Sequence, residues 1–186
     1  MEAYDVGRFN VTSGQLVATD PCYGTEMGDP NTINNVKNGQ WMCFIVTEDC
    51  GENWGTRIKR LCINHVDFND DADTGLWEDT GFVVGVDSGQ AGFFDATMVH
   101  RTSEELYGFI CENSRDGMVG ENYAVSQSGF GDGGYECMLT RDADGKVVAA
   151  IIEFISDEDD EEVYDDEFEP DADLFAEDDE FNGDPD

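Results

Sequence analysis

The stretch Phe82–Asp95, FVVGVDSGQAGFFD, decides the predicted fold. It begins as an apolar run over residues 82–86, passes through the turn formers Asp-Ser-Gly-Gln at 87–90, and returns as an apolar run over 91–94. β-Branched and aromatic residues bounded by Gly, Asp and Ser are typical of a strand, a tight turn and a second strand. Because nearly every position of the run is apolar, we expect it to lie mid-core, covered on both faces, with Asp87 and Asp95 at strand ends.

Other segments predict further strands and one helix. The strands are expected over residues 15–19, 40–47, 56–65, 122–127, 135–141 and 146–155. Asp142-Ala143-Asp144-Gly145 separates the last two strands and is typical of a hairpin turn. Thr102–Asn113 begins with a capping-box pattern. Its Leu106, Phe109 and Ile110 recur at helical spacing. Short strands with turn signals and one helix predict an α+β fold, mainly an antiparallel β-sheet or sandwich.

The charge is unevenly distributed along the chain. The formal net charge is -35, and residues 156–186 hold 18 of the 44 acidic residues and none of the 9 basic ones. This segment lacks strand or helix periodicity, so we expect one β-rich globular domain over 1–155 and a disordered acidic tail over 156–186. Such a charge repels nucleic acid and anionic membranes, and it favours basic partners, cations or simple solubility.

Aromatic residues recur within the acidic tail, although a segment that serves only solubility does not need them. Acidic and hydrophobic residues interleaved in this way are typical of segments that dock on a basic groove. The alternative is a solvated tail without a partner. The expected partner-binding residues are Tyr164, Asp165, Asp166, Glu167, Phe168, Phe175 and Phe181.

Motifs that the sequence lacks indicate the expected cellular compartment and narrow the kinds of chemistry that we expect. The sequence shows no secretion signal, in which charged residues precede an apolar run, and no apolar stretch long enough to span a membrane. We therefore expect a soluble cytoplasmic protein. The six cysteines include no CxxC pair, and Cys43 and Cys137 sit in apolar segments, which predicts reduced, buried thiols. Without a Walker loop, a GxSxG motif or a dinucleotide fingerprint, we expect no cofactor and favour a non-enzyme. A Cys22 nucleophile with His65 or His100 remains an open alternative.

Three predicted loops each combine an acid with turn formers directly after a strand. They lie at 20–23, 87–90 and 128–133. If they converge, their carboxylates could bind a divalent cation or a small ligand, or act as acid and base. The structural alternative is that each Asp caps its own turn. The candidate ligand-binding residues are Asp20, Cys22, Asp87, Asp95 and Asp132. A second metal candidate has calcium-loop spacing, with Ala72 where Gly is needed, at Asp67, Asn69, Asp71, Asp73 and Glu78.

Four segments carry a resemblance to known sequences. They are SGQLVATDPCY at 13–23, INNVKNGQW at 33–41, GVDSGQAGFFD at 85–95 and SGFGDGGYECMLTRDADGKVVAAIIEF at 128–154. In this order they resemble a family of bacteriophage and bacterial proteins classified only as a domain of unknown function. The resemblance spans roughly residues 10–155 and leaves out the acidic tail. It implies a phage or bacterial cytoplasmic protein, and it carries over no activity and no catalytic residues.

These observations favour an acidic, non-enzymatic interaction protein that binds a basic protein surface. By analogy with small acidic phage proteins, it would be a phage-encoded inhibitor or a nucleic-acid mimic. The first alternative is a small-ligand or metal-binding domain, including a hydrolytic one, that uses the Asp-rich loops. The second is a structural virion or assembly component. Neither nucleic acid nor membrane is expected as a direct partner, and the oligomeric state is left open.

Overall fold

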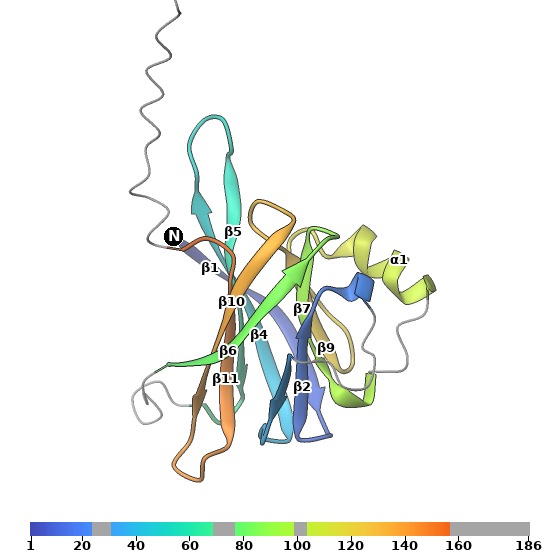
Figure 1. Cartoon of the computed structure of the whole chain (residues 1–186), viewed down its shortest axis with the longest axis vertical. Helices are drawn as coiled ribbons and strands as arrows, with labels where there is room; N and C mark the ends of the chain where they lie inside the picture. Colours follow the sequence, from blue (N-terminus) through green and yellow to red (C-terminus); the bar gives the residue numbers. More distant parts are fainter. Residues whose placement is uncertain (24–30, 69–76, 99–103, 157–186) are drawn as a thin grey trace, which may run out of the picture.

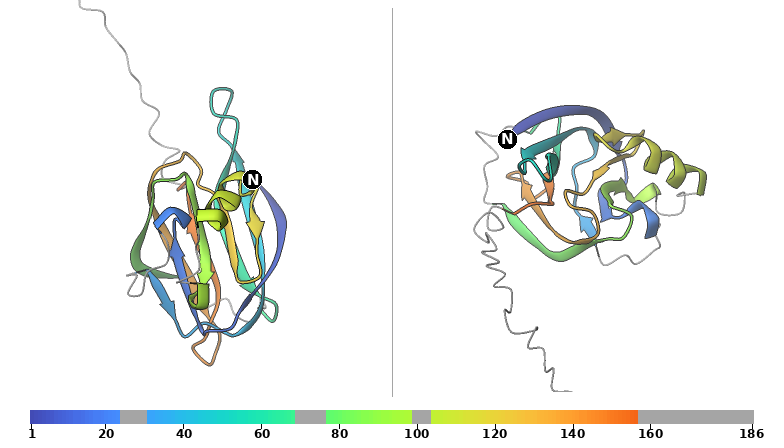
Figure 2. Two further views of the ribbon diagram at one scale, coloured as in Figure 1. Left: turned by 90° about the vertical axis from the view of Figure 1, so that its right-hand side faces the viewer. Right: turned by 90° about the horizontal axis from the view of Figure 1, so that it is seen from above.

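Two antiparallel β-sheets packed face to face make up the structure, a computed structural model that describes residues 1–23, 31–68, 77–98 and 104–156 (Figures 1 and 2). The six-stranded sheet has the strand order β1-β4-β5-β11-β10-β6, and the five-stranded sheet has the order β3-β2-β7-β9-β8. Every strand pair in both sheets is antiparallel. The predicted α+β class with mainly antiparallel strands is therefore confirmed.

The element bounds follow the turn signals of the sequence. The six-stranded sheet comprises β1 (Glu2–Val11), β4 (Gly39–Asp49), β5 (Thr56–His65), β6 (Glu78–Val86), β10 (Gly133–Arg141) and β11 (Val147–Glu153). The five-stranded sheet comprises β2 (Gln15–Thr19), β3 (Thr32–Asn34), β7 (Gln90–Asp95), β8 (Met118–Val119) and β9 (Tyr123–Gln127). The helical elements are η1 (Pro21–Tyr23), η2 (Ala96–Met98) and α1 (Glu104–Asn113). β10 and β11 pair across residues 142–145, which confirms the predicted hairpin.

The stretch Phe82–Asp95 joins the two sheets instead of forming a hairpin within one. β6 lies at the edge of the six-stranded sheet, whereas β7 lies in the middle of the five-stranded sheet. β7 is buried at all six positions, as predicted. The core between the sheets covers one face of the strand, and the apolar cluster that includes residues of α1 covers the other. In β6, Val83 is 61% exposed while Val84 and Val86 are buried. The expectation that β6 is covered on both faces is therefore wrong, since its outer face meets solvent.

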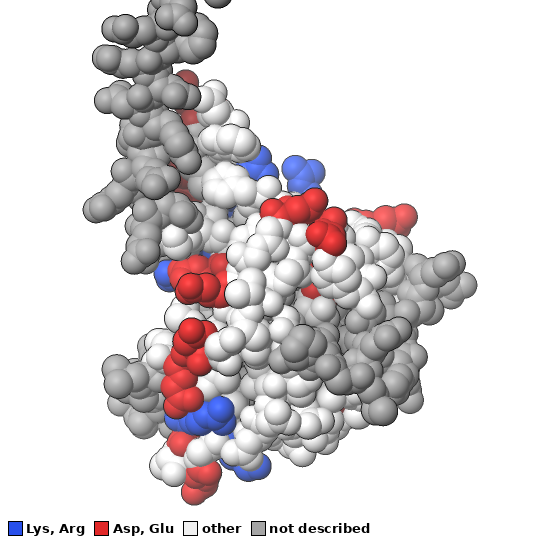
Figure 3. All heavy atoms as spheres, in the orientation of Figure 1, with Lys and Arg blue, Asp and Glu red and all other residues white. Residues whose placement is uncertain are grey.

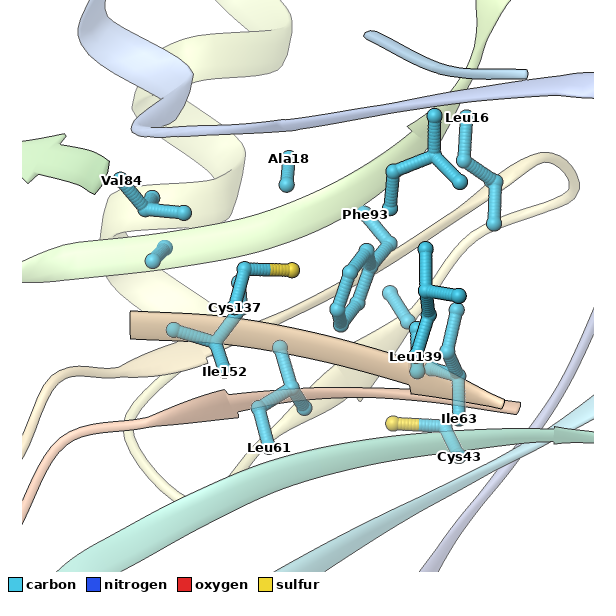
Figure 4. Close-up of a cluster of buried hydrophobic side chains, with 14 of the residues drawn as sticks. Leu16, Ala18, Cys43, Leu61, Ile63, Val84, Phe93, Cys137, Leu139 and Ile152 are labelled. Atoms are coloured by element: carbon cyan, nitrogen blue, oxygen red, sulfur yellow. The ribbon is translucent and has the colours of Figure 1, made fainter. Parts of the chain in front are cut away.

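The main core lies between the sheets and is built from alternate residues of each strand. Figure 4 shows Leu16 and Phe93 of the five-stranded sheet opposite Leu61 and Ile152 of the six-stranded sheet. The predicted inward face of β4 is confirmed, because its alternate residues are buried. Those residues are Trp41, Cys43 and Ile45. Cys43 and Cys137 are free and buried here, which confirms the expectation of buried thiols.

The helix α1 confirms the predicted helix, whose expected cap Thr102 lies outside the described residues. Ile110 is buried and packs with Phe94 and Tyr123 on the outer face of the five-stranded sheet, and Leu106 packs against this cluster. Phe109 was expected on the same face but is 53% exposed. Phe109 lies about 100° around the helix from Ile110, so it is at the margin of the apolar face and outside the part that the sheet covers.

Three strands were not predicted. β1 is polar along most of its length, and Phe9 and Val11 are its buried residues. β3 lies between the strands predicted over 15–19 and 40–47, and β8 has only two residues. The predicted disordered tail, with all of its expected partner-binding residues, lies outside the described residues apart from Ser156.

Basic side chains pair with acids on the six-stranded sheet. Lys59 Nζ lies 2.8 Å from Glu48 Oε2, although Lys59 is fully buried. Arg60 Nη2 lies 2.5 Å from Glu153 Oε1, so both of these β5 cations pair with an acid of a neighbouring strand. Within the described residues, no helix has the length and apolar character needed to cross a membrane.

Candidate functional site

The first two predicted loops meet through Asp20, which directly follows β2. Its Oδ2 accepts hydrogen bonds from the backbone amides of Asp87 at 2.8 Å and Ser88 at 2.7 Å. Its Oδ1 accepts from the Ser88 hydroxyl at 2.6 Å and from the Cys22 amide at 2.7 Å. Asp20 is fully buried. Four hydrogen bonds occupy this carboxylate, so its observed role is to hold the two loops together.

The third loop reaches the same end of the molecule. The Ser128 amide donates to the Gly89 carbonyl at 3.0 Å. A Cβ atom added at Gly89 would lie 3.9 Å from Gly131 Cα, and the φ angle of Gly89 is +69°, which favours glycine. The three loops therefore converge, which the sequence had left open. They meet beside η1 and α1 at the upper right of Figure 1.

The candidate carboxylates nevertheless do not form one cluster. Asp87 is exposed and accepts a hydrogen bond from the Tyr23 hydroxyl. Asp132 is exposed and lies in the turn before β10. Asp95 lies at the opposite end of β7, where β2 residue Leu16 is its register partner. The hypothesis of a shared pocket for all four carboxylates, which also included Asp20, is therefore wrong with respect to Asp95.

Asp95 performs a local structural role that mirrors that of Asp20. Its Oδ2 accepts from the amides of Thr12 at 2.5 Å and Ser13 at 3.0 Å, and its Oδ1 accepts from the Thr97 amide at 2.8 Å and hydroxyl at 2.6 Å. Burial alone would raise the pKa of Asp95, but the hydrogen bonds from Thr97, Ser13 and Thr12 outweigh burial and lower the pKa. This carboxylate ties the β1–β2 turn to the end of β7.

Two exposed cysteines lie beside the converged loops. Cys22 belongs to η1 and Cys111 to α1, and η1 and α1 are in contact. Desolvation, a hydrogen bond to Asp20 and the nearby charges raise the pKa of Cys22 from 9.0 to about 12. A hydrogen bond with Cys111 raises the pKa of Tyr107, and desolvation adds to this. At neutral pH the Cys22 thiol is therefore protonated, which is unfavourable for a nucleophile.

The remaining predicted metal and nucleophile candidates lie elsewhere. His65 packs edge-on against Trp41 and contacts the Asn38 carbonyl and Asp67, away from η1. His100 lies outside the described residues, as do Asn69, Asp71 and Asp73 of the calcium-loop candidate. In the described part of the chain, no three His, Cys, Asp or Glu side chains are grouped so as to hold a metal ion.

A pocket that the sequence did not predict opens near the base of the β4–β5 hairpin. Its volume is about 380 Å³, and Trp54, Arg57 and Arg115 contribute to its wall. The available sequence signal was the run of basic residues Arg57, Lys59 and Arg60 within the strand predicted over 56–65. Arg115 gave no signal, since its distance from that cluster in sequence hides their proximity.

Comparisons with known proteins return no relatives. No family model matches the chain, no curated protein matches it, and no solved structure matches it. The resemblance to phage and bacterial proteins of unknown function therefore stays a prediction.

Proposed function

We propose that the protein is an acidic, non-enzymatic interaction protein of the bacterial or phage-infected cytoplasm that binds a basic protein surface. The observation that carries this proposal is the charge distribution: 18 acidic residues and no basic residue in 156–186, interleaved with four aromatic residues. Clustered carboxylates supply long-range attraction to a basic surface, and aromatic side chains supply the anchors. The finer form of the proposal is a phage-encoded inhibitor or a nucleic-acid mimic of a host factor.

The described body supports this proposal through its surface charge. Red acidic side chains outnumber blue basic ones on the face in Figure 3. Several of the basic groups are already paired internally, including Lys59 with Glu48 and Arg141 with Glu78. Residues 1–155 hold 26 acidic and 9 basic residues, so the body keeps an acidic excess of its own, which would add to the attraction of residues 156–186 for a basic surface.

The site geometry weighs against the hydrolytic alternative. A general acid–base pair needs carboxylates that can reach a substrate. The carboxylates of Asp20 and Asp95 are each occupied by four hydrogen bonds from the fold. Both carboxylates therefore serve as structural ties, Asp20 at the converged loops and Asp95 at the opposite end of β7, and neither is free to act on a substrate.

The proposal is tested with the full-length chain as bait in a bacterial lysate. Phe168→Ala with Phe175→Ala removes two anchors, and the matched control, Asp165→Asn with Asp166→Asn, removes two charges from the same segment. We expect one basic protein to be retained by the wild type at low salt and released at about 0.5 M NaCl, because salt screens exposed charges.

The two variants separate the contributions to that binding. Loss of the partner with the Phe pair, and a smaller loss with the Asp pair, would support aromatic anchoring. Equal losses would indicate a purely electrostatic mimic. Retention of the same partner by both variants would contradict the proposal, and stable self-association of the purified chain would favour the virion or assembly alternative instead.

A specific observation favours one second candidate, small-ligand binding beside α1. The Oε1 atom of Gln90 and the Oγ atom of Ser114 are buried without a hydrogen-bond partner among the described residues. Gln90 directly follows the converged turn at 87–89, and its register partner Gln127 donates its amide to the Ser114 carbonyl. Unpartnered buried polar atoms favour a bound polar group. Chemical-shift changes at these residues on titration with a fragment library would test this candidate.

A further inference from the structure

The pocket at the base of the β4–β5 hairpin is polar and basic on a protein that is otherwise strongly acidic. Its volume is about 380 Å³. The residues that matter for its chemistry are Ile45, Trp54, Arg57, Ile58, Arg115 and Gly129. Asp116 is the acidic residue among its lining residues, so the two arginines leave a net positive charge in the pocket wall.

The two pocket arginines differ from most basic residues of the body. Lys37, Lys59, Arg60 and Arg141 each pair with an acid. Arg57 instead donates from Nε to the Trp54 carbonyl at 2.8 Å and lies 5.9 Å from the centroid of the Trp54 ring. Neither Arg57 nor Arg115 forms an ion pair with an acid of the described residues. Their guanidinium groups therefore remain available to a carboxylate.

An exposed aromatic pair stands beside these arginines. Trp54 is 58% exposed and Phe130 is 52% exposed, and their rings meet edge to face with centroids 5.4 Å apart. Large aromatic side chains left in solvent next to arginine are typical of a surface that receives another aromatic group. The pocket thus suits a ligand that carries both carboxylates and an aromatic ring.

The described chain ends at the wall of this pocket. The amides of Phe154 and Ile155 donate to the Lys59 carbonyl at 2.7 and 3.3 Å. A Cβ atom added at Gly129, a lining residue, would lie 3.0 Å from Ile155 Cγ1 and 3.1 Å from the Ile58 carbonyl oxygen. Residues 157–186 therefore start beside the pocket. Eight further residues, up to Tyr164, reach at most about 28 Å when fully extended, which is ample to enter it.

We propose that this pocket is the docking site of the acidic, aromatic segment 157–186 of the same chain. Carboxylates of the segment pair with Arg57 and Arg115, and one of its aromatic rings packs on Trp54 and Phe130. Because the segment is tethered beside the pocket, its effective concentration there is on the order of millimolar, and a weak contact is sufficient for docking. This inference goes beyond the proposed function: the segment is held by its own body until a more basic partner competes for it.

The test uses the full-length chain labelled with 5-fluorotryptophan and observed by ¹⁹F NMR. Trp54→Phe assigns the Trp54 signal among the three tryptophans. We expect the Trp54 signal to move when Phe168, Phe175 and Phe181 are all replaced by Ala. We expect the wild-type signal to move the same way in about 0.5 M NaCl. A Trp54 signal that is unchanged by both would overturn the proposal, and a shift that depends on protein concentration would show docking between copies and overturn the intramolecular assignment.

A second measurement varies the pocket itself and follows cleavage of segment 157–186 by a Glu-specific protease. Arg57→Ser with Arg115→Ser should speed this cleavage by roughly threefold or more, because an undocked segment is more accessible. The matched control is Arg8→Ser, which removes an exposed cation from β1 that is not among the pocket-lining residues. Equal cleavage rates in all three chains would contradict docking. These readouts need no partner, so their failure is distinguishable from failure of the lysate experiment.

Discussion

Both oxygens of the Asp20 carboxylate accept a hydrogen bond from Ser88. Oδ2 lies 2.7 Å from the Ser88 amide nitrogen, and Oδ1 lies 2.6 Å from the Ser88 hydroxyl oxygen. Asp20 directly follows β2 of the five-stranded sheet, and Ser88 lies in the turn that follows β6 of the six-stranded sheet. A single buried side chain therefore links the ends of both sheets.

We expect Asp20→Asn to lower the free energy of unfolding by about 2–4 kcal/mol, because the amide nitrogen would face donors that now bind a carboxylate oxygen. Urea unfolding followed by circular dichroism measures the loss. Asp87→Asn is the matched control in the adjoining turn, where the exposed side chain contacts Tyr23. A similar loss in both variants would contradict the structural role assigned to Asp20.

Asp95→Asn should destabilise the protein in a pH-dependent way. The pKa of Asp95 lies below its ordinary value of 3.8, so the folded protein favours the carboxylate. This stabilisation is present above pH 3.8 and is lost as the pH falls through the lower folded-state pKa. The difference in unfolding free energy between wild type and variant should therefore be largest near pH 7 and shrink at about pH 3. A constant difference across this range would contradict the prediction.

The Lys59–Glu48 pair should respond asymmetrically to substitution. Glu48→Gln leaves the buried Lys59 ammonium beside a neutral side chain and should lower the free energy of unfolding by about 3 kcal/mol. Lys59→Met leaves Glu48, which retains some exposure to solvent, and should be less damaging. The double variant should be more stable than Glu48→Gln alone. Chemical denaturation of the three chains measures the cycle, and additive losses would show that the two side chains are not coupled.

Cys22 should react slowly although it is exposed. With its pKa raised to about 12, roughly one thousandth of the usual thiolate is present near pH 8. The higher basicity of the thiolate offsets part of this deficit, so alkylation by iodoacetamide should be roughly 30- to 100-fold slower than for an ordinary thiol. Peptide mapping by mass spectrometry follows the site. The same protein in denaturant supplies the control rate, and equal rates in both conditions would contradict the raised pKa.

Local patterns in the sequence were sufficient for much of the fold. The hairpin at 142–145 and the alternation of β4 were predicted because turn chemistry and side-chain period are local properties. The separation of β6 and β7 into different sheets was not predicted, since FVVGVDSGQAGFFD also fits a hairpin. The choice depends on the distant partners Gly133–Leu139 for β6 and Tyr123–Gln127 for β7.

The candidate site was predicted only in part. Convergence of the three loops was left open by the sequence. The structural alternative, in which each Asp caps its own turn, holds for the hydrogen bond from the Cys22 amide to Asp20, whereas the other three hydrogen bonds of Asp20 come from Asp87 and Ser88. Asp95 was grouped with Asp20 because both are acids at strand ends. β2 and β7 are antiparallel neighbours, however, so their C-terminal ends, where Asp20 and Asp95 lie, are at opposite ends of the sheet. Arg57 and Arg115 are far apart in sequence, so their shared place in one pocket could be seen only in the tertiary structure.

The position of β11 has a consequence for how the protein is made. β11 is the last described strand in sequence, yet it lies between β5 and β10 in the six-stranded sheet. Until the ribosome releases Val147–Glu153, the growing chain can form only the separate groups β1-β4-β5 and β10-β6, each with an open edge. Unpaired strand edges invite association with other chains. Chains that stop short of β11 therefore lack the strand that joins β5 to β10 and leave both of these strands open to association.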